Sequence, residues 1–260
     1  MSASSLAEFG YQVLCTAEPE GKALLTQAAQ QCFDGGCLPI GRTEPPERPA
    51  RPATPFLLPA RAMPKRPAGT LQGRIALIHA LAHIELNAID LAWDMLCRFG
   101  SGMPPGFSRD WLSVASDEAK HFRLLSKRLT SLGSHYGALP AHDGLWAAAG
   151  RTAHDVLARL AVVPLVLEAR GLDVTPGMIA RLRMAGDGRS ARILSLIARE
   201  EIRHVRTGWL WFDDVARRRG LVPKAAFAEL VRLHHAGRIK PPFNIQARAQ
   251  AGLSEDFYLS

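Results

Sequence analysis

A repeated arrangement of glutamate and histidine is the feature that most constrains how this chain can fold. Glutamate is scarce over residues 48–199, where it occurs only three times. One pattern, a glutamate followed 33 residues later by a Glu-x-x-His motif, occurs twice: Glu85 with Glu118 and His121, and Glu168 with Glu201 and His204. Two such motifs and two single glutamates, each on its own helix, are the ligand set of a two-metal four-helix bundle.

Chance is a poor explanation for this repetition. With 12 glutamates and 9 histidines among 260 residues, about 0.4 Glu-x-x-His pairs are expected at random, and two occur. Their surroundings also match, because Asp-Glu-Ala-Lys-His and Glu-Glu-Ile-Arg-His both carry an acid before the glutamate and a base before the histidine. On a helix, residues three apart lie close to one face, so each pair can reach one point inside a bundle. Oxygen and imidazole ligands favour iron or manganese, with zinc as a further option.

The two single glutamates are predicted to be buried. Glu85 has alanine, leucine and isoleucine at its helical-neighbour positions, and Glu168 follows the apolar run LAVVPLVL. A buried carboxylate must be paired, protonated or bound to metal. The alternative to metal binding is a salt bridge to a buried arginine. Glu168 is the less secure ligand, because Pro164 and Gly171 predict a kinked or broken helix around it.

Other polar residues near the motifs have weaker interpretations. Asp117 and Glu200 are candidates to accept the second ring N–H of a ligand histidine, and the alternative is a solvated flank. His79 and His83 stand four apart, but His83 lies far around the helix from Glu85. We therefore expect both of these histidines to serve in packing or in hydrogen bonds between helices.

The pattern of the whole chain predicts an all-α protein. Residues 1–69 are expected to form two short helices and a Pro/Arg-rich extended arm. Residues 70–221 are expected to form a four-helix bundle with a long crossover, of the ferritin-like kind. Residues 222–260 are expected to form a short helix and an irregular tail. The main helices are expected at about 70–98, 108–132, 146–170 and 188–219, with a short extra helix opening at Thr175-Pro176. The apolar Phe56-Leu57-Leu58 suggests that part of the arm packs on the body.

Composition limits the class of protein. The sequence shows neither a secretory signal nor an apolar run of membrane-span length, so we expect a cytoplasmic protein. Four scattered cysteines, Cys15, Cys32, Cys37 and Cys97, are read as reduced thiols. The formal net charge is +8, with basic clusters over residues 42–74 and 217–224 outside the bundle core. This excess favours an anionic partner such as RNA, although an arginine-rich composition alone can produce it.

The ligand residues give the chain a resemblance to the ferritin-like superfamily of di-iron carboxylate proteins. The segments HALAHIELNAIDLAWD, SDEAKHF and AREEIRHV, with the tail KPPFNIQARAQAGL, look more closely like a bacterial ferritin-like family of unknown function. This resemblance covers roughly residues 50–255 and implies the fold and the metal site, without a substrate. A more distant likeness, mainly in the ligand pattern, is to the ferritin-like tRNA hydroxylase that oxidises a prenylated adenosine.

These observations lead to one main functional hypothesis and two alternatives. The main hypothesis is an O₂-dependent hydroxylase or oxidase with two iron ions, in which Glu118 and Glu201 bridge the metals. It acts on an unknown substrate, receives electrons from a donor protein, and has RNA as one candidate substrate. The first alternative is metal handling without an organic substrate, which predicts a large assembly, whereas we expect a monomer or small homo-oligomer. The second alternative is a basic RNA-associated protein with a structural metal site.

Overall fold

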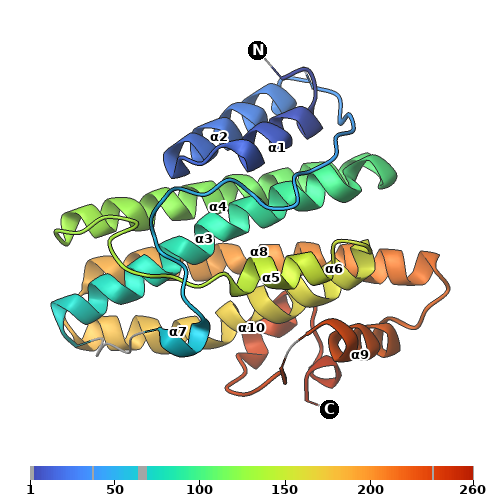
Figure 1. Ribbon diagram of the computed structural model, residues 1–260. Coiled ribbons are helices and arrows are strands. Elements are labelled where there is room, and N and C mark those ends of the chain that lie inside the picture. The colour runs from blue at the N-terminus through green and yellow to red at the C-terminus, as the bar shows by residue number, and fades with distance from the viewer. Residues whose placement is uncertain (1–2, 37, 64–68, 236, 260) are drawn as a thin grey trace. The chain divides into compact units, whose positions relative to one another are not determined.

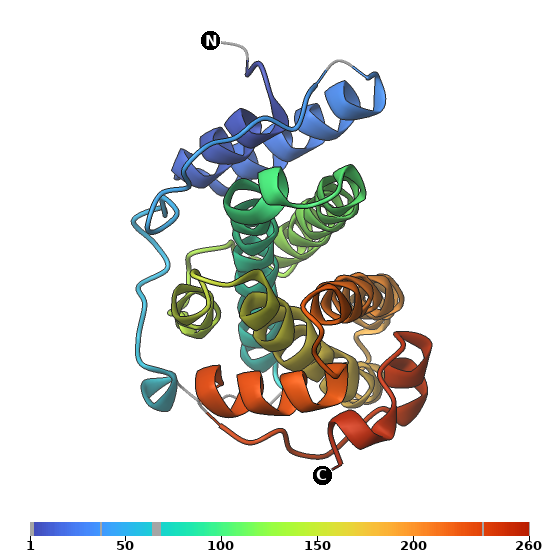
Figure 2. The same cartoon turned by 90° about the vertical axis from the view of Figure 1, so that its right-hand side faces the viewer.

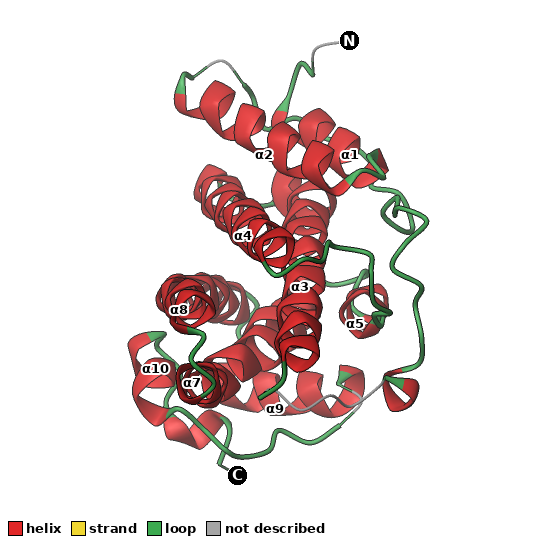
Figure 3. Ribbon diagram, turned by 90° about the vertical axis from the view of Figure 1, so that its left-hand side faces the viewer, coloured by secondary structure: helices red, strands yellow, loops and turns green. Residues whose placement is uncertain are grey.

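The computed structural model describes residues 3–36, 38–63, 69–235 and 237–259, and every regular element in them is helical. Figure 3 accordingly shows helices joined by loops, and the β pairing found in these described ranges is one isolated parallel bridge between Leu57 and Ala141. The predicted all-α class is confirmed. The chain divides into two compact units, residues 1–146 and 147–260, and each is described by itself below.

The first unit is built on two long helices that lie side by side. Its elements are α1 (Leu6–Cys15), α2 (Pro19–Asp34), η1 (Ala60–Ala62), α3 (Leu71–Phe99), η2 (Gly100–Gly102) and α4 (Pro105–Ser131), and the short α5 (Gly144–Arg151) contains the boundary between the units. In Figure 1, α3 and α4 run alongside each other, and α1 and α2 form a second pair. The Thr70 side chain caps α3 by accepting a hydrogen bond from the Gly73 N–H.

The start of α4 differs from the expectation. The predicted capping residues, Ser108 or Asp110, lie inside the helix, which begins at Pro105. Proline suits the first turn of a helix, because its fixed φ matches and its missing N–H has no partner there in any case. The first turn therefore forms without a side-chain cap, and Ser108 is buried instead.

A buried ion pair joins the N-terminal hairpin to α3. Lys22 of α2 donates to Asp90 Oδ1 at 2.6 Å and to the Val13 carbonyl at 2.9 Å, and both charged side chains are fully buried. Arg51 lies 3.5 Å from the other carboxylate oxygen and donates to Asn87. Such a group gives little net stability when intact, but loss of one partner leaves a buried charge uncompensated.

The proline-rich arm packs on the first unit, although not in the expected way. Phe56 is 74% exposed, and Leu57 and Leu58 are also exposed, so these three side chains do not anchor it. The buried residues in the described part of this stretch are Pro49 and Pro55. The backbone also pairs with the loop after α4: the Leu58 N–H donates to the Ala141 carbonyl, and the Ala141 N–H donates to Phe56. The part of the arm at Lys65 and Arg66 lies outside the described residues.

The second unit departs furthest from the predicted helices. Its elements are α6 (Val156–Val162), a π-helical segment η3 (Val163–Glu168), α7 (Ala169–Met184), α8 (Gly188–Arg218), α9 (Pro223–His234), α10 (Ile245–Gln250) and η4 (Glu255–Phe257). In Figure 2, α8 is seen almost along its axis and α9 runs across it. The single helix expected over residues 146–170 is wrong: α5 ends at Arg151, and Asp155 caps α6 by accepting from the N–H groups of Leu157 and Ala158.

Two prolines explain the rest of this difference. Pro164 lies in the π-helical segment, where the chain takes the wider turn that a missing backbone hydrogen bond permits. Pro176 was expected to open a new helix but lies inside α7. The Asn244 side chain donates to the Leu172 carbonyl, the acceptor that a proline at 176 leaves unused, and α7 continues through it. The tail expected to be irregular contains α10 and η4.

Helix α3 is apolar enough to be considered as a membrane-spanning helix. The helical stretch Leu71–Gly102, formed by α3 and η2, is long and apolar enough to cross a membrane, with a mean hydropathy of 1.4, contrary to the expectation from the sequence. However, 67% of its most apolar window is buried inside the protein, and Glu85, Asp90 and Asp94 are buried along it. Charged groups at these positions are costly in a bilayer. The helix has the character of the core helix of a soluble protein.

Candidate metal centre

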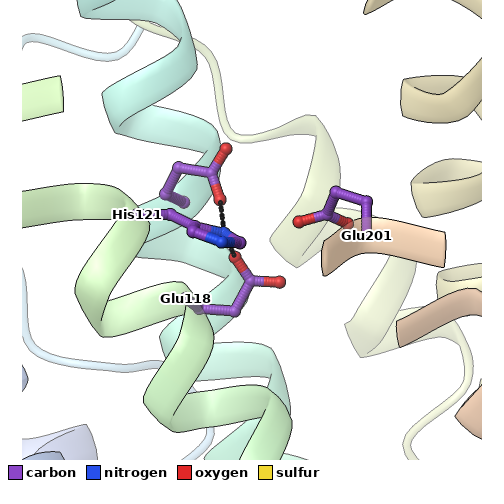
Figure 4. A group of neighbouring side chains, drawn as sticks. Glu118, His121 and Glu201 are labelled. Carbon is purple, nitrogen blue, oxygen red and sulfur yellow. Dashed lines mark ion pairs between the residues drawn. The ribbon is translucent and has the colours of Figure 1, made fainter. Parts of the chain in front are cut away.

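In the first unit, the structure brings Glu85, Glu118 and His121 together. Glu85 lies near the middle of α3, and Glu118 and His121 lie one turn apart on α4. The His121 Nδ1 atom is 3.4 Å from Glu85 Oε2 and 3.5 Å from Glu118 Oε2. Figure 4 shows Glu118 and His121 on α4, with dashed lines for these ion pairs. All three residues are at most 5% exposed, so the group is enclosed by protein.

The charges of this group suit a cation. One ligand atom from each residue lies within 4.8 Å of the other two, which is close enough to surround a metal ion. Burial raises the pKa of Glu85 well above its usual value, and the neighbouring Glu118 carboxylate raises it further, while His121 acts in the opposite direction. Two carboxylates held together in a dry interior repel each other, and a bound cation removes that cost. The arrangement therefore fits a metal ion, and histidine rather than a buried arginine is the partner of Glu85.

In the second unit, α8 holds the matching motif. The His204 Nδ1 atom lies 3.4 Å from Glu201 Oε1, a distance nearly equal to that in the first motif. The His204 residue is buried, whereas 15% of the Glu201 side chain is exposed. Figure 4 shows Glu201 projecting from α8. The remaining predicted ligand, Glu168, is half-buried and is the last residue of the π-helical segment.

A glycine on α8 allows the π-helical segment to pack closely. An added Cβ at Gly208 would lie 2.4 Å from the Cβ of Pro164 and 2.5 Å from its Cγ. A proline ring is rigid, so any larger residue at 208 would displace the segment that ends at Glu168. Sequence reasoning missed Gly208, although a glycine inside a long helical pattern is a signal of close backbone approach.

Asp117 and Glu200, the candidate partners for ligand histidines, are both half-buried. Asp117 accepts an ion pair from Lys120 at 2.8 Å, one turn along the same helix. Only 16% of the Asp117 side chain is exposed, so the ion pair with Lys120 leaves most of this side chain buried. For both acids, a hydrogen bond accepted from the second ring N–H of a ligand histidine stays a prediction.

The two α3 histidines serve in packing and hydrogen bonding, as predicted, but their hydrogen-bond partners lie in the loop after α4 and not on another helix. His79 Nε2 accepts from the Gly137 N–H at 3.0 Å, and the two ring nitrogens of His83 lie 2.8 Å from the Tyr136 hydroxyl and 3.2 Å from the His142 carbonyl. Both rings stack against Tyr136. Burial lowers the pKa of each histidine to about 4, so both are neutral near pH 7. They hold the loop that follows α4 against α3.

Comparison with known protein families places the chain in a family of unknown function. The family model described as "Protein of unknown function (DUF455)" matches residues 15–259 of this chain. The chain belongs to the DUF455 family. Among its relatives is a protein of Haemophilus influenzae named only as uncharacterized, which is 42% identical over 212 residues, covering 79% of this chain and 74% of the relative. No solved structure matches this DUF455 protein. Its function must therefore be argued from its own residues.

Proposed function

We propose that this DUF455 protein is a two-metal carboxylate oxidoreductase of the ferritin-like type that uses O₂. The proposed ligands of the metal pair are Glu85, Glu118, His121, Glu168, Glu201 and His204. The observation that carries the proposal is the buried group of Glu85, Glu118 and His121, whose ligand atoms lie within 4.8 Å of one another. The second Glu-x-x-His pair, with nearly the same internal geometry on α8, supplies the matching half.

The side chains have distinct tasks in this proposal. Carboxylate and imidazole ligands suit iron or manganese, and bound ferrous iron would supply the electrons that reduce O₂. Burial of Glu85 and Glu118 keeps water from competing with their oxygens for the metals. The π-helical segment places Glu168 on irregular backbone, an arrangement often found at functional sites. The substrate and the electron donor are not specified by these residues.

Metal handling without an organic substrate is the competing proposal, and the same ligands serve it. It requires a large closed assembly, and mass measurement in solution distinguishes it from a monomer or small oligomer. A structural metal in an RNA-associated protein is the other alternative, and it predicts that chelation leaves RNA binding unchanged.

The decisive experiment counts metal ions per chain and measures O₂ consumption. The purified protein, loaded anaerobically with ferrous iron, is expected to hold two ions and to consume O₂ when a reductant is supplied. The double variant Glu118→Ala/His204→Ala is expected to lose at least one ion and the O₂ consumption. A matched control, Glu229→Ala/His234→Ala, removes the same residue types from α9 and should behave as wild type. Iron-dependent O₂ consumption that persists in the first variant would refute the proposal.

A further inference from the structure

The net positive charge is concentrated in the second unit. Residues 147–260 contain 18 lysines and arginines against 11 aspartates and glutamates, a net charge of +7, whereas residues 1–146 contain 14 against 13, a net charge of +1. The basic clusters singled out from the sequence do not account for this excess. Arg217, Arg218 and Arg219 each form an ion pair with an aspartate. The charge that remains lies elsewhere in the unit.

The outer face of α8 is made of arginine. Between residues 189 and 209 every exposed residue of this helix is an arginine: Arg189, Arg192, Arg199, Arg203 and Arg206. An exposed helix face ordinarily mixes both signs of charge, because pairs of opposite charge one turn apart stabilise it. Here neither an acid nor a large apolar side chain is exposed among the arginines. We call these five residues the arginine row.

The arginine row is straight and lies opposite the ligand face. At 100° per residue, Arg192, Arg199, Arg203 and Arg206 fall within about 60° around the helix, and they span about 21 Å along it. The metal-ligand candidates Glu201 and His204 lie about 120° to 180° around from Arg192. One face of α8 thus carries the buried Glu-x-x-His motif, and the other presents a line of cations to solvent.

Most of these cations have no carboxylate to neutralise them. Within the part of the chain that the structure describes, no ion pair is found for Arg192, Arg199 or Arg206, whereas Arg203 takes part in a further interaction. Like charges in one row repel each other, and this arrangement costs stability unless an anion binds. The contrast with the paired Arg217 and Arg218 on the last turns of the same helix is direct.

We propose that the arginine row binds the phosphate backbone of a nucleic acid, with RNA as the ligand to test first. Guanidinium groups bind phosphate oxygens in a bidentate way, and a row of about 21 Å is long enough to face several phosphates. A membrane surface fits less well, because an interfacial helix needs apolar side chains beside its cations, and here the nearest is Leu210, beyond the row. The proposal does not depend on metal binding.

The contacts are to the backbone and not to the bases. The nearest aromatic residues on α8 are engaged inside the unit: Trp209 stacks on Phe212 and packs edge-on against Phe257. The Trp209 ring is therefore occupied by other aromatic rings, whereas many proteins that hold single strands stack bases on free aromatic rings. Binding is expected to be insensitive to sequence and strongly dependent on salt.

The test uses the full-length protein and a labelled 20-nucleotide RNA, with affinity measured by fluorescence anisotropy over a range of salt concentrations. Four phosphate contacts predict that log K falls with log salt with a slope of about −3 for a single strand. The triple variant Arg192→Gln/Arg199→Gln/Arg206→Gln should reduce that slope by about 2 and weaken binding at least ~30-fold at low salt.

A matched control distinguishes the effect of the arginine row on RNA affinity from the effect of losing any three positive charges. The triple variant Arg217→Gln/Arg218→Gln/Arg232→Gln removes the same charge from exposed residues that are already paired, so its affinity should stay within about threefold of wild type. Equal losses in the two triple variants would overturn the proposal. The single variant Arg199→Gln, which changes the fold least, should lower the slope by about 0.7, and an unchanged slope would also count against it.

Two further anionic ligands test whether the partner is a nucleic acid or another anionic surface. Vesicles containing phosphatidylserine and a poly-glutamate peptide present anionic surfaces without a nucleic-acid backbone. Both are expected to bind more weakly than RNA at the same salt concentration. Tighter binding of either, or no binding of RNA by the wild-type protein, would overturn the assignment. Binding of DNA of the same sequence with similar affinity supports contact with phosphates over contact with bases.

Discussion

The two units hold the same motif in different surroundings. In the first unit, Glu85, Glu118 and His121 lie on two long uninterrupted helices and are almost fully buried. In the second, the motif on α8 accompanies Glu168, which ends a π-helical segment and is half-buried, and the Glu201 side chain is partly exposed. Regular helices fix ligand positions tightly, whereas a π-helical turn introduces an extra residue and a place that can adjust. If the proposed metal site forms, the first unit holds its candidate ligands on more rigid backbone than the second unit does.

The contacts that hold the main helices in place also differ between the two units. Buried charges and neutral histidines hold α3 in place in the first unit. In the second unit, the fully buried Asp173 of α7 binds Arg248 of α10 through two hydrogen bonds of 2.8 and 2.7 Å. The Arg248 guanidinium lies over the rings of Phe243 and Tyr258, so the C-terminal segment is held against α7 by charge and aromatic contact together.

Acid is expected to affect the first unit most. The pKa of His79 and of His83 is about 4 in the folded protein, below the unfolded value of about 6.5, so their stabilising contribution is complete above pH 6.5 and is lost as pH falls toward 4. At pH 5 the loss is roughly 2 kcal/mol for each histidine. Urea unfolding at pH 7.5 and pH 5 measures it. The double variant His79→Gln/His83→Gln should show a smaller fall with pH.

The exposed His154 of the second unit provides the control. The variant His154→Gln should keep the pH dependence of the wild-type protein. A double His79/His83 variant whose free energy of unfolding falls with pH as steeply as in wild type would show that these buried rings do not set the acid response.

Close packing in the second unit is tested by adding a single methyl group. Gly208→Ala places a Cβ against the ring of Pro164, and overpacking of this kind costs about 1–3 kcal/mol. The matched control is Gly171→Ala, also inside a helix, where an added Cβ meets nothing within 4 Å and alanine should stabilise by about 0.5–1 kcal/mol. Thermal unfolding measures both. Similar effects in the two variants would remove the assigned role of Gly208.

The smallest expected effect compares the two motif glutamates in the absence of metal. Glu118→Gln removes a carboxylate that repels Glu85 in a buried group, so the metal-free protein should become more stable by about 1 kcal/mol. Glu201→Gln acts on a partly exposed side chain, and its effect should stay within about 0.5 kcal/mol. Urea unfolding with a chelator present gives both values. A larger gain in the free energy of unfolding from Glu201→Gln than from Glu118→Gln would contradict the view that charge repulsion is greater in the first unit.

Sequence reasoning succeeded where local patterns decide structure. The long helices α3 and α8 begin and end within a residue or two of the predicted positions, because caps and glycines mark their ends. It was right that Pro164 makes the backbone irregular before Glu168. It failed at Arg151, where one helix ends, and at Gly171 and Pro176, which both lie inside α7. Pro164 takes part in a π-helical turn, and Asn244, 68 positions beyond Pro176, satisfies the carbonyl that Pro176 leaves free. No local pattern carries that information.

The cysteines also show which properties the sequence predicts and which depend on the folded structure. Cys15, Cys32 and Cys97 are free and differ in exposure, as expected for reduced thiols in a chain of this size, and Cys37 lies outside the described residues. Exposure itself could not be read from spacing. Burial raises the pKa of the Cys97 thiol to about 12, so this residue is chemically inert.

By itself the sequence determined the helical class and which glutamates and histidines share a helix face, because three-residue spacing fixes direction around a helix axis. Only the tertiary structure decided which groups are close in space and which charges are neutralised. It paired Glu85 with His121 and buried Lys22 against Asp90. Within the described residues, it left Arg192, Arg199 and Arg206 of the arginine row without an ion pair. Pairing and burial depend on contacts between segments far apart in the chain, and the free energy of a charged group depends on those contacts far more than on its neighbours in sequence.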